Sequence, residues 1–289
     1  MGPDPRLTML LAMADDELVL GHRHAEWTGW APYLEEDLAF SSIAQDEMAH
    51  ARALYELAEP LAEGDTDRLA FGRTPEAYRH AVICERPNRD WGYSLARHYL
   101  YDTADDLRLS SLERSSWSEL ADLVRTIRLE ERYHVEHAEM WVSRLAGGPV
   151  EGRQRLAQGL EAAIGEALAI FEAVPDEGSL VDDGIMPRSS EDLLTEWLDR
   201  VGTRLEEASL DYVLSAHAPA GGEMVPTSTG EIEAGSTLTV PGIERRDGSW
   251  VHVGEFAGQG GRQGRHTDDF QAVWEEMTGL YRAIPGATW

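Results

Sequence analysis

Two copies of the pattern Glu-x-x-His carry the clearest chemistry in this sequence: Glu47-Met-Ala-His50 and Glu131-Arg-Tyr-His134. Residues three apart lie on one face of a helix, so each copy can present a carboxylate and an imidazole together. Two such helices, with one carboxylate from each of two further helices, form the ligand set of a carboxylate-bridged di-iron four-helix bundle. The pattern therefore predicts a bundle built around two metal ions.

The two remaining carboxylates are predicted to be Glu17 and Asp102, which lie thirty and twenty-nine residues before the two motifs. Asp105 and Asp106 are rivals to Asp102 on the same segment. Alternatives remain open at both positions: Glu17 could belong to a solvated acidic patch, and Asp102 could form a core ion pair with an arginine. The predicted ligand set is therefore Glu17, Glu47, His50, Asp102, Glu131 and His134.

The apolar periodicity supplies four long helices to position these groups. Apolar residues recur every three or four positions over residues 5–27, 33–59, 91–112 and 117–146. In the two helices that carry Glu-x-x-His, both motif residues interrupt an otherwise apolar stripe. Because burying an unpaired polar group is costly, this placement favours metal ligands over solvated side chains.

The rest of the chain is expected to surround the bundle. Further helices are predicted over about 151–174, 190–214 and 267–283, and a β-hairpin is indicated at Asp247-Gly248. The fold class is all-α, a ferritin-like four-helix di-metal bundle with extra C-terminal helices and a short hairpin-like insert. The expected organisation is a helical domain over 5–216, a Gly/Ser-rich insert over 217–265, and a C-terminal helix and tail over 266–289 that packs back on the bundle.

Carboxylates and neutral imidazoles suit iron or manganese, whereas bridging carboxylates and open positions make zinc a poorer match. Two ferrous ions in such a site can reduce O2 and produce an oxidant for a C–H or C=C bond. The expected cofactor is therefore a pair of iron ions. Their electrons would come from a separate reductase, because the sequence shows no dinucleotide-binding glycine motif and no cysteine cluster.

Composition restricts the partners and the compartment. The 289 residues carry a formal net charge of −28, and all 25 basic residues are arginine. Such a surface repels phosphates and argues against nucleic-acid binding; it fits either a halophilic protein or an ordinary acidic one. The sequence has one cysteine, no signal peptide and no long apolar run, so we expect a cytoplasmic protein without membrane spans.

Several segments together resemble the C subunit family of the multicomponent phenylacetyl-CoA epoxidase. These segments are residues 21–39, 95–102, 130–134 and 261–267, followed by the ending Pro285-Gly-Ala-Thr-Trp289. The similarity covers nearly the whole chain except about 222–260. The resemblance implies aerobic phenylacetate catabolism, epoxidation of the phenylacetyl-CoA ring, and an oligomer that includes a related oxygenase subunit and a reductase.

The resemblance leaves three functions to compare. In that family the C subunit has typically lost metal ligands and serves as the structural partner of the di-iron subunit, whereas this sequence keeps Glu or His at 17, 47, 50 and 131. The first hypothesis is therefore a component that retains a di-iron site, and the second is a non-catalytic partner subunit. The third is a ferritin-like protein for iron storage or peroxide scavenging, which the length and the C-terminal region argue against.

An acyl-CoA substrate carries phosphates, so an acidic chain needs a local group of arginines to bind it. The candidates are Arg245 and Arg246 near the predicted hairpin turn and Arg262 and Arg265 in the glycine-rich segment. A solvated turn and a salt-bridged loop are the alternative explanations for these four residues.

Overall fold

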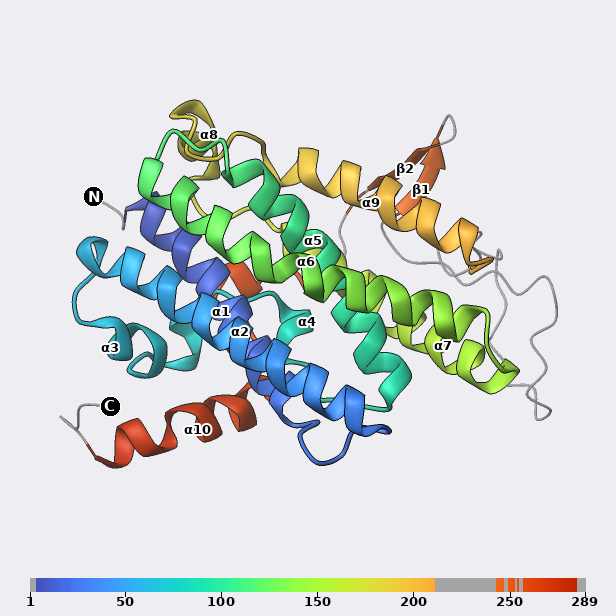
Figure 1. The fold of residues 1–289 in the computed structure, drawn as a ribbon. Coiled ribbons are helices and arrows are strands. Elements are labelled where there is room, and N and C mark those ends of the chain that lie inside the picture. The colour runs from blue at the N-terminus through green and yellow to red at the C-terminus, as the bar shows by residue number, and fades with distance from the viewer. Residues whose placement is uncertain (1–3, 211–242, 247–248, 253, 255–256, 285–289) are drawn as a thin grey trace.

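Four long helices form the centre of the computed structural model, which describes residues 4–210, 243–246, 249–252, 254 and 257–284. They are α1 (Pro5–Ala25), α2 (Leu34–Ala58), α5 (Trp91–Leu112) and α6 (Ser118–Ala146). Helix α1 packs along α2, α5 packs along α6, and α2 also contacts α6 (Figure 1). The predicted all-α bundle is confirmed, and each predicted bundle helix ends within a few residues of its expected bounds.

Local sequence signals explain where three of the helices begin. The Asp4 side chain accepts a hydrogen bond from the Arg6 backbone N–H at 2.9 Å, and Pro5 opens the first turn of α1. The Asp90 side chain accepts from the Tyr93 backbone N–H at 3.0 Å and caps α5. Acidic residues fill the first turn of α2, where they stabilise the positive end of the helix dipole.

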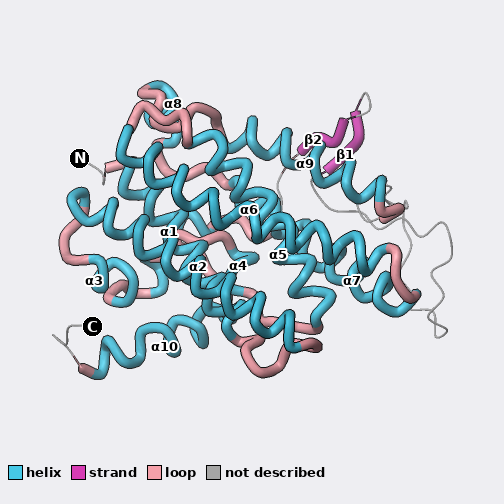
Figure 2. Tube along the Cα trace, in the orientation of Figure 1, coloured by secondary structure: helices cyan, strands magenta, loops and turns pink. Residues whose placement is uncertain are grey.

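Shorter elements cover the bundle (Figure 2). In chain order they are η1 (Glu59–Leu61), α3 (Thr66–Phe71), η2 (Pro75–Ala77), α4 (Val82–Glu85), α7 (Val150–Ala167), η3 (Leu168–Phe171), α8 (Glu177–Asp182), α9 (Ser190–Glu207), η5 (Gly261–Gln263) and α10 (Asp268–Ala283). Helices α7 and α9 pack against α5, whereas α10 contacts α1, α3 and α4.

The predicted helices over 151–174 and 190–214 are shorter than expected. The first changes to a 3-10 turn at Leu168, and the second stops before Ser209, which has a positive φ of 53°.

Helices α5 and α7 approach each other closely at two glycines. A Cβ atom added at Gly159 would lie 2.6 Å from the Gly92 carbonyl oxygen, and one added at Gly92 would lie 2.7 Å from the Arg155 carbonyl oxygen. Side chains at these positions would force the two helices apart. The pair of glycines therefore sets the distance between the bundle and its outer layer.

The predicted hairpin is present as the antiparallel strands β1 (Ile243–Arg246) and β2 (Ser249–His252). Arg245 and Arg246 lie in β1, as expected of residues that precede the predicted turn, and residues 247–248 are outside the described residues. Trp250 is buried against α9, where a Cβ atom at Gly202 would meet its ring at 2.3 Å. The hairpin thus packs on the helical core through the buried side chains of Trp250 and Ile243.

Candidate di-metal centre

The bundle brings the predicted ligands into its buried interior. One comes from α1, two from α2, one from α5 and two from α6, and each is at most 3% exposed: Glu17, Glu47, His50, Asp102, Glu131 and His134. Four carboxylates in a core are unstable unless cations or protons balance them. The positions predicted from helical phase therefore converge on one side of each helix, toward the same interior.

Direct contacts join four of the six side chains. His50 Nδ1 lies 3.4 Å from Glu17 Oε2 and 3.3 Å from Glu131 Oε1. Glu131 Oε1 is also 3.1 Å from His134 Nδ1. One ligand atom from each of Glu17, His50 and Glu131 lies within 4.8 Å of the other two, close enough to share an ion.

The two remaining carboxylates, Glu47 and Asp102, interact electrostatically with this group. Burial raises the pKa of Glu47 well above its usual value, and the charges of Glu17 and Asp102 raise it further. Burial also raises the pKa of Asp102, followed in effect by the charge of Glu131. Glu47, Asp102 and Glu131 therefore influence one another's protonation, and added protons substitute for missing positive charge.

The imidazoles supply that charge when metal is absent. Burial opposes protonation of His50, but its hydrogen bonds to Glu131 and Glu17 raise its pKa to about 11. Burial likewise opposes ionisation of Glu131, yet the charge of His134 and the hydrogen bonds from both histidines lower its pKa to about 2. Divalent ions would take over the role of these protons.

Two buried oxygens in the cluster, Asp102 Oδ1 and Glu131 Oε2, have no hydrogen-bond partner among the described residues. Each of Glu47 Oε1, Asp102 Oδ2 and His134 Nδ1 has only one ionisable neighbour, at 3.0, 2.6 and 3.1 Å. Buried polar atoms in folded proteins are normally hydrogen-bonded, so two unpaired oxygens beside sparsely paired ligand atoms need a reason. Carboxylate oxygens and imidazole nitrogens are ligands that iron and manganese accept. The residues present fit a pair of such ions.

The rival aspartates on α5 have arginine partners instead. Asp105 pairs with Arg108, and Asp106 lies 2.9 Å from both Arg128 and Arg200. These partners satisfy the two carboxylates without metal. Asp102 has no arginine at ion-pair distance; its Oδ2 lies 2.6 Å from His98 Nδ1.

Carboxylates next to the motifs hold the two ligand histidines from the opposite helix. His50 Nε2 lies 2.8 Å from Glu130 Oε2, and His134 Nε2 lies 3.4 Å from Asp46 Oδ2. Each partner directly precedes the Glu of the other motif. Such contacts fix the orientation of a ligand imidazole and strengthen it as a ligand. Sequence reasoning missed Asp46 and Glu130, although an acidic residue before each Glu-x-x-His was the available signal.

A buried polar layer of histidines, with Glu36 and Trp141, adjoins the cluster. His98 Nε2 lies 3.1 Å from His137 Nδ1, and His137 Nε2 lies 2.9 Å from Glu36 Oε2. The Trp141 indole N–H donates to the same Glu36 oxygen at 2.7 Å. His24, which is fully buried, lies 3.0 Å through Nδ1 from Glu47 Oε2. His24 and His98 thus contact the predicted ligands Glu47 and Asp102, and His137 contacts His98. All three histidines are buried.

Comparison with known proteins agrees with this architecture. The family model for the phenylacetic acid catabolic protein, the PaaA and PaaC type, matches residues 3–224. The chain belongs to this family. It is also 29% identical over 282 residues to the C subunit of 1,2-phenylacetyl-CoA epoxidase from Escherichia coli (strain K12), covering 96% of this chain and 97% of that protein.

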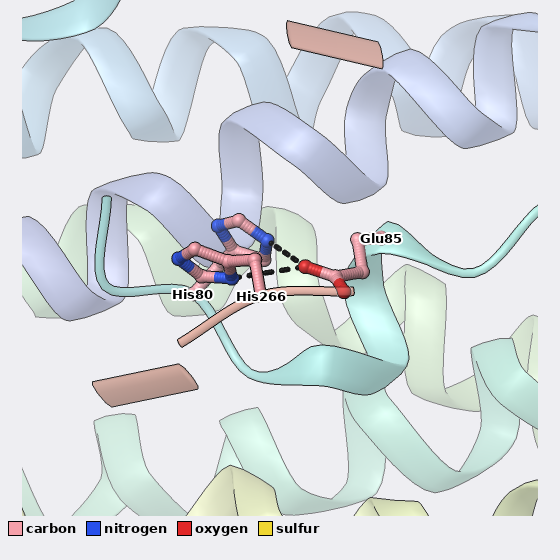
Figure 3. Close-up of side chains that lie close together, drawn as sticks. All are labelled: His80, Glu85 and His266. Atoms are coloured by element: carbon pink, nitrogen blue, oxygen red, sulfur yellow. Dashed lines mark hydrogen bonds and ion pairs between the residues drawn. The ribbon is translucent and has the colours of Figure 1, made fainter. Parts of the chain in front are cut away.

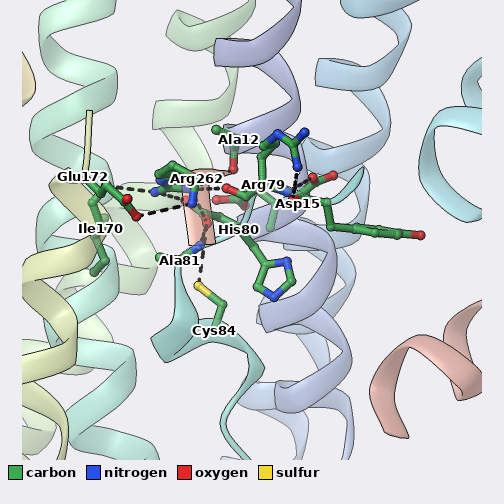
Figure 4. Close-up of polar contacts among 12 residues, drawn as sticks. Ala12, Asp15, Arg79, His80, Ala81, Cys84, Ile170, Glu172 and Arg262 are labelled. Carbon is green, nitrogen blue, oxygen red and sulfur yellow. Dashed lines mark hydrogen bonds and ion pairs between the residues drawn. The ribbon is translucent and has the colours of Figure 1, made fainter. Parts of the chain in front are cut away.

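The four arginines predicted to bind an acyl-CoA substrate differ in burial, and Arg262 is buried. Arg262 is 1% exposed, and its two terminal nitrogens bind Asp16 at 2.7 and 2.8 Å. They also donate to the carbonyl oxygens of Ala12, Arg79 and Ile170 (Figure 4). This internal network leaves no surface guanidinium at position 262 for a phosphate.

The other three predicted substrate arginines stay predictions. Arg265 is exposed beside a cavity of about 520 Å³ that Gln259 and Gln263 also line. Arg246 is exposed on β1, and the Arg245 side chain lies outside the described residues. Within the described part of the chain, no helix is long and apolar enough to cross a membrane.

Proposed function

We propose that this chain is a subunit of a multicomponent oxygenase that epoxidises the ring of phenylacetyl-CoA, and that it binds two iron ions through the six residues of the buried cluster. The observation that carries the proposal is the burial of four carboxylates and two histidines together in the bundle core, where Asp102 Oδ1 and Glu131 Oε2 have no hydrogen-bond partner among the described residues. The family membership and the similarity to an epoxidase component support the reaction class. Electrons would come from a separate reductase.

The side chains have distinct parts in this proposal. Glu17, Glu47, Asp102 and Glu131 supply negative charge, and His50 and His134 complete the ligand set. Asp46 and Glu130 orient the two imidazoles. Bound iron supplies the reduction of O2, which carboxylates and imidazoles do not perform themselves. The surrounding apolar side chains exclude water and thereby strengthen every electrostatic interaction within the site.

The test is anaerobic reconstitution with Fe(II), followed by metal counting and measurement of O2 consumption with phenylacetyl-CoA, the sister subunits and the reductase. We expect about two iron ions per chain in the wild type. Glu131→Ala should lose this iron, whereas Glu136→Ala, a change at an exposed glutamate of the same helix, should retain it. Equal iron content in the two variants would contradict the assignment.

The second candidate function is a non-catalytic partner subunit, which the similarity to the C subunit of an epoxidase favours. A folded wild-type chain that binds no iron, yet raises the activity of a sister subunit, would establish that alternative. Storage or peroxide scavenging, the third candidate, would require assembly into a cage and iron uptake well beyond two ions per chain.

A further inference from the structure

A second group of metal-ligating side chains lies outside the bundle centre. His80 precedes α4, Glu85 ends it, and His266 follows η5, so residues 181 positions apart in the chain meet here. His80 and Glu85 are fully buried, and the His266 side chain is only 5% exposed. Figure 3 shows both imidazoles directed toward one end of the Glu85 carboxylate.

The two oxygens of Glu85 have different partners. Oε1 accepts hydrogen bonds from the Thr267 backbone N–H at 2.7 Å and from the Thr267 hydroxyl at 2.6 Å. Oε2 lies 2.7 Å from His80 Nε2 and 2.9 Å from His266 Nδ1. One oxygen is thus held by Thr267, and the other faces two ring nitrogens.

The hydrogen bond on the far side of His266 fixes its tautomer. His266 Nε2 lies 3.1 Å from the Tyr78 carbonyl oxygen, which can only accept, so Nε2 carries the hydrogen. In the neutral ring, Nδ1 then presents a lone pair to the lone pairs of Glu85 Oε2. Two acceptors at 2.9 Å repel each other unless a cation lies with them.

The buried His80 ring completes the group. Its Nε2 lies 2.7 Å from Glu85 Oε2, while its Nδ1 has no hydrogen-bond partner within the described part of the chain. A metal ion bound by Nε2 displaces any hydrogen from that atom, so we expect binding to release or relocate a proton.

We propose that His80, Glu85 and His266 bind a divalent transition-metal ion such as Zn²⁺, which fastens the segment 261–267 to α4. Two imidazoles and a carboxylate are a common ligand set for zinc and for iron, with a fourth position left for water. Tyr78 and Thr267 provide the outer hydrogen bonds that orient two of the ligands. This site shares no residue with the bundle centre.

Binding has a structural consequence at the two rings. They are stacked, with centroids 4.0 Å apart and planes 14° from parallel. An ion bonded to both rings must lie near both ring planes, so the rings must turn away from the parallel arrangement on binding. The C-terminal segment would move little, because the backbone of Thr267 remains bonded to Glu85.

The experiment uses the full-length chain with Glu47→Gln and Glu131→Gln, which disable the bundle centre. Chelator-treated protein is titrated with Co²⁺ and Zn²⁺, and the visible absorption of Co²⁺ and the bound zinc are measured. We expect one ion per chain with the intact cluster, and a rise in melting temperature on adding Zn²⁺. Adding His266→Gln should abolish both, whereas His22→Gln, a half-buried histidine outside both clusters, should change neither.

The alternative explanation is a protonated His266, whose Nδ1–H would donate a hydrogen bond to Glu85 Oε2 without any metal ion. In that case the chain with an intact cluster binds no Co²⁺ and no Zn²⁺ after chelation, and this result overturns the proposal even if His266→Gln fails to fold. Unchanged binding of one ion in a folded His266→Gln variant would overturn it equally. Because the bundle centre is disabled throughout, neither outcome depends on the proposed oxygenase function.

Discussion

At the scale of single residues, the bundle centre shows how the proposed ligands differ from ordinary buried charges. Asp105 and Asp106 are satisfied by arginines, whereas Asp102 contacts only an imidazole through Oδ2 and its Oδ1 has no hydrogen bond among the described residues. Sequence alone placed all three on one helix but could not rank them by their partners. The distinction arises from Arg108 and Arg128, whose reach to the carboxylates depends on side-chain geometry.

Removing one carboxylate should separate metal binding from folding. Burial, followed by the charge of Glu17, raises the pKa of Glu47 in the metal-free chain. A carboxyl group with a raised folded pKa contributes stability below its unfolded pKa and loses that contribution as pH rises. Glu47→Gln should therefore abolish iron binding yet stabilise the metal-free chain at pH 7, by about 1.4 kcal/mol for each pKa unit relieved.

Urea denaturation of metal-free protein at pH 4 and pH 7 measures this effect. The stability gain from Glu47→Gln should be larger at pH 7 than at pH 4. At pH 7 the unfolded wild-type chain ionises Glu47 freely, whereas burial opposes its ionisation in the folded chain. Glu136→Gln serves as the control at an exposed position and should be neutral at both pH values. A Glu47→Gln variant that is less stable than wild type at pH 7 would refute the electrostatic explanation.

The outer carboxylates should tune affinity without abolishing binding. Asp46→Asn keeps the shape of the side chain but weakens its hold on His134 Nε2. We expect iron affinity to fall about 10- to 100-fold, the usual effect of losing such a partner. Asp122→Asn, at an exposed position of α6, is the matched control. Equal affinities in a competition with a calibrated chelator would show that Asp46 does not support the ligand.

Alanine substitutions at Arg262 and Arg265 are predicted to have different effects on the unfolding free energy, although both residues lie in the same glycine-rich segment. Arg262→Ala leaves the buried Asp16 without its two-pronged partner and should cost about 3 kcal/mol or more in unfolding free energy. Arg265→Ala should leave stability within about 0.5 kcal/mol because the side chain is exposed. If Arg265 binds acyl-CoA, its removal should weaken that binding by about 1–3 kcal/mol, measured by calorimetry.

At the scale of elements, the long helices were predictable because their polar ligands interrupt clear apolar stripes. The short helices α3, α4 and α8 were not predicted. A helix of four residues such as α4 has no periodicity to detect, and long-range contacts such as that of Glu85 with Thr267 hold it in place. For Arg262 the sequence offered a salt-bridged loop as one explanation, which agrees with the structure, but it did not identify the buried partner because Asp16 lies 246 residues away.

The contact between α5 and α7 gives a test at this scale. Gly159→Ala places a Cβ 2.6 Å from the Gly92 carbonyl oxygen and should separate the helices, at a cost of about 1–3 kcal/mol. Gly279→Ala in α10 meets no atom within 4 Å and should stabilise the protein by up to about 1 kcal/mol through helix propensity. Chemical denaturation of both variants measures the difference; similar free energies would mean that the two helices do not set each other's spacing.

At the scale of the whole molecule, the outer faces of α2 and α6 carry exposed apolar side chains. Leu34 and Leu38 are 70% and 65% exposed on α2, and Leu129 and Tyr133 are 67% and 48% exposed on α6. Large apolar groups at a protein surface commonly mark an interface. We predict that a related oxygenase subunit docks on these faces, because they carry several of the most exposed large apolar side chains among the described residues.

This proposal predicts a selective loss of association. Leu129→Asp and Tyr133→Asp should each weaken the complex with the sister subunit by about 2 kcal/mol or more if the residue lies at the centre of the interface. Val150→Asp is the matched control, because Val150 is 71% exposed at the start of α7, outside helices α2 and α6. Sedimentation velocity at several salt concentrations measures how strongly the wild type, the α6 variants and the α7 control associate with the sister subunit. This chain has a net charge of −28, so its association with an acidic sister subunit should strengthen as added salt screens the repulsion between them. If the α6 variants and the α7 control associate equally at high salt, the docking face lies elsewhere on the molecule.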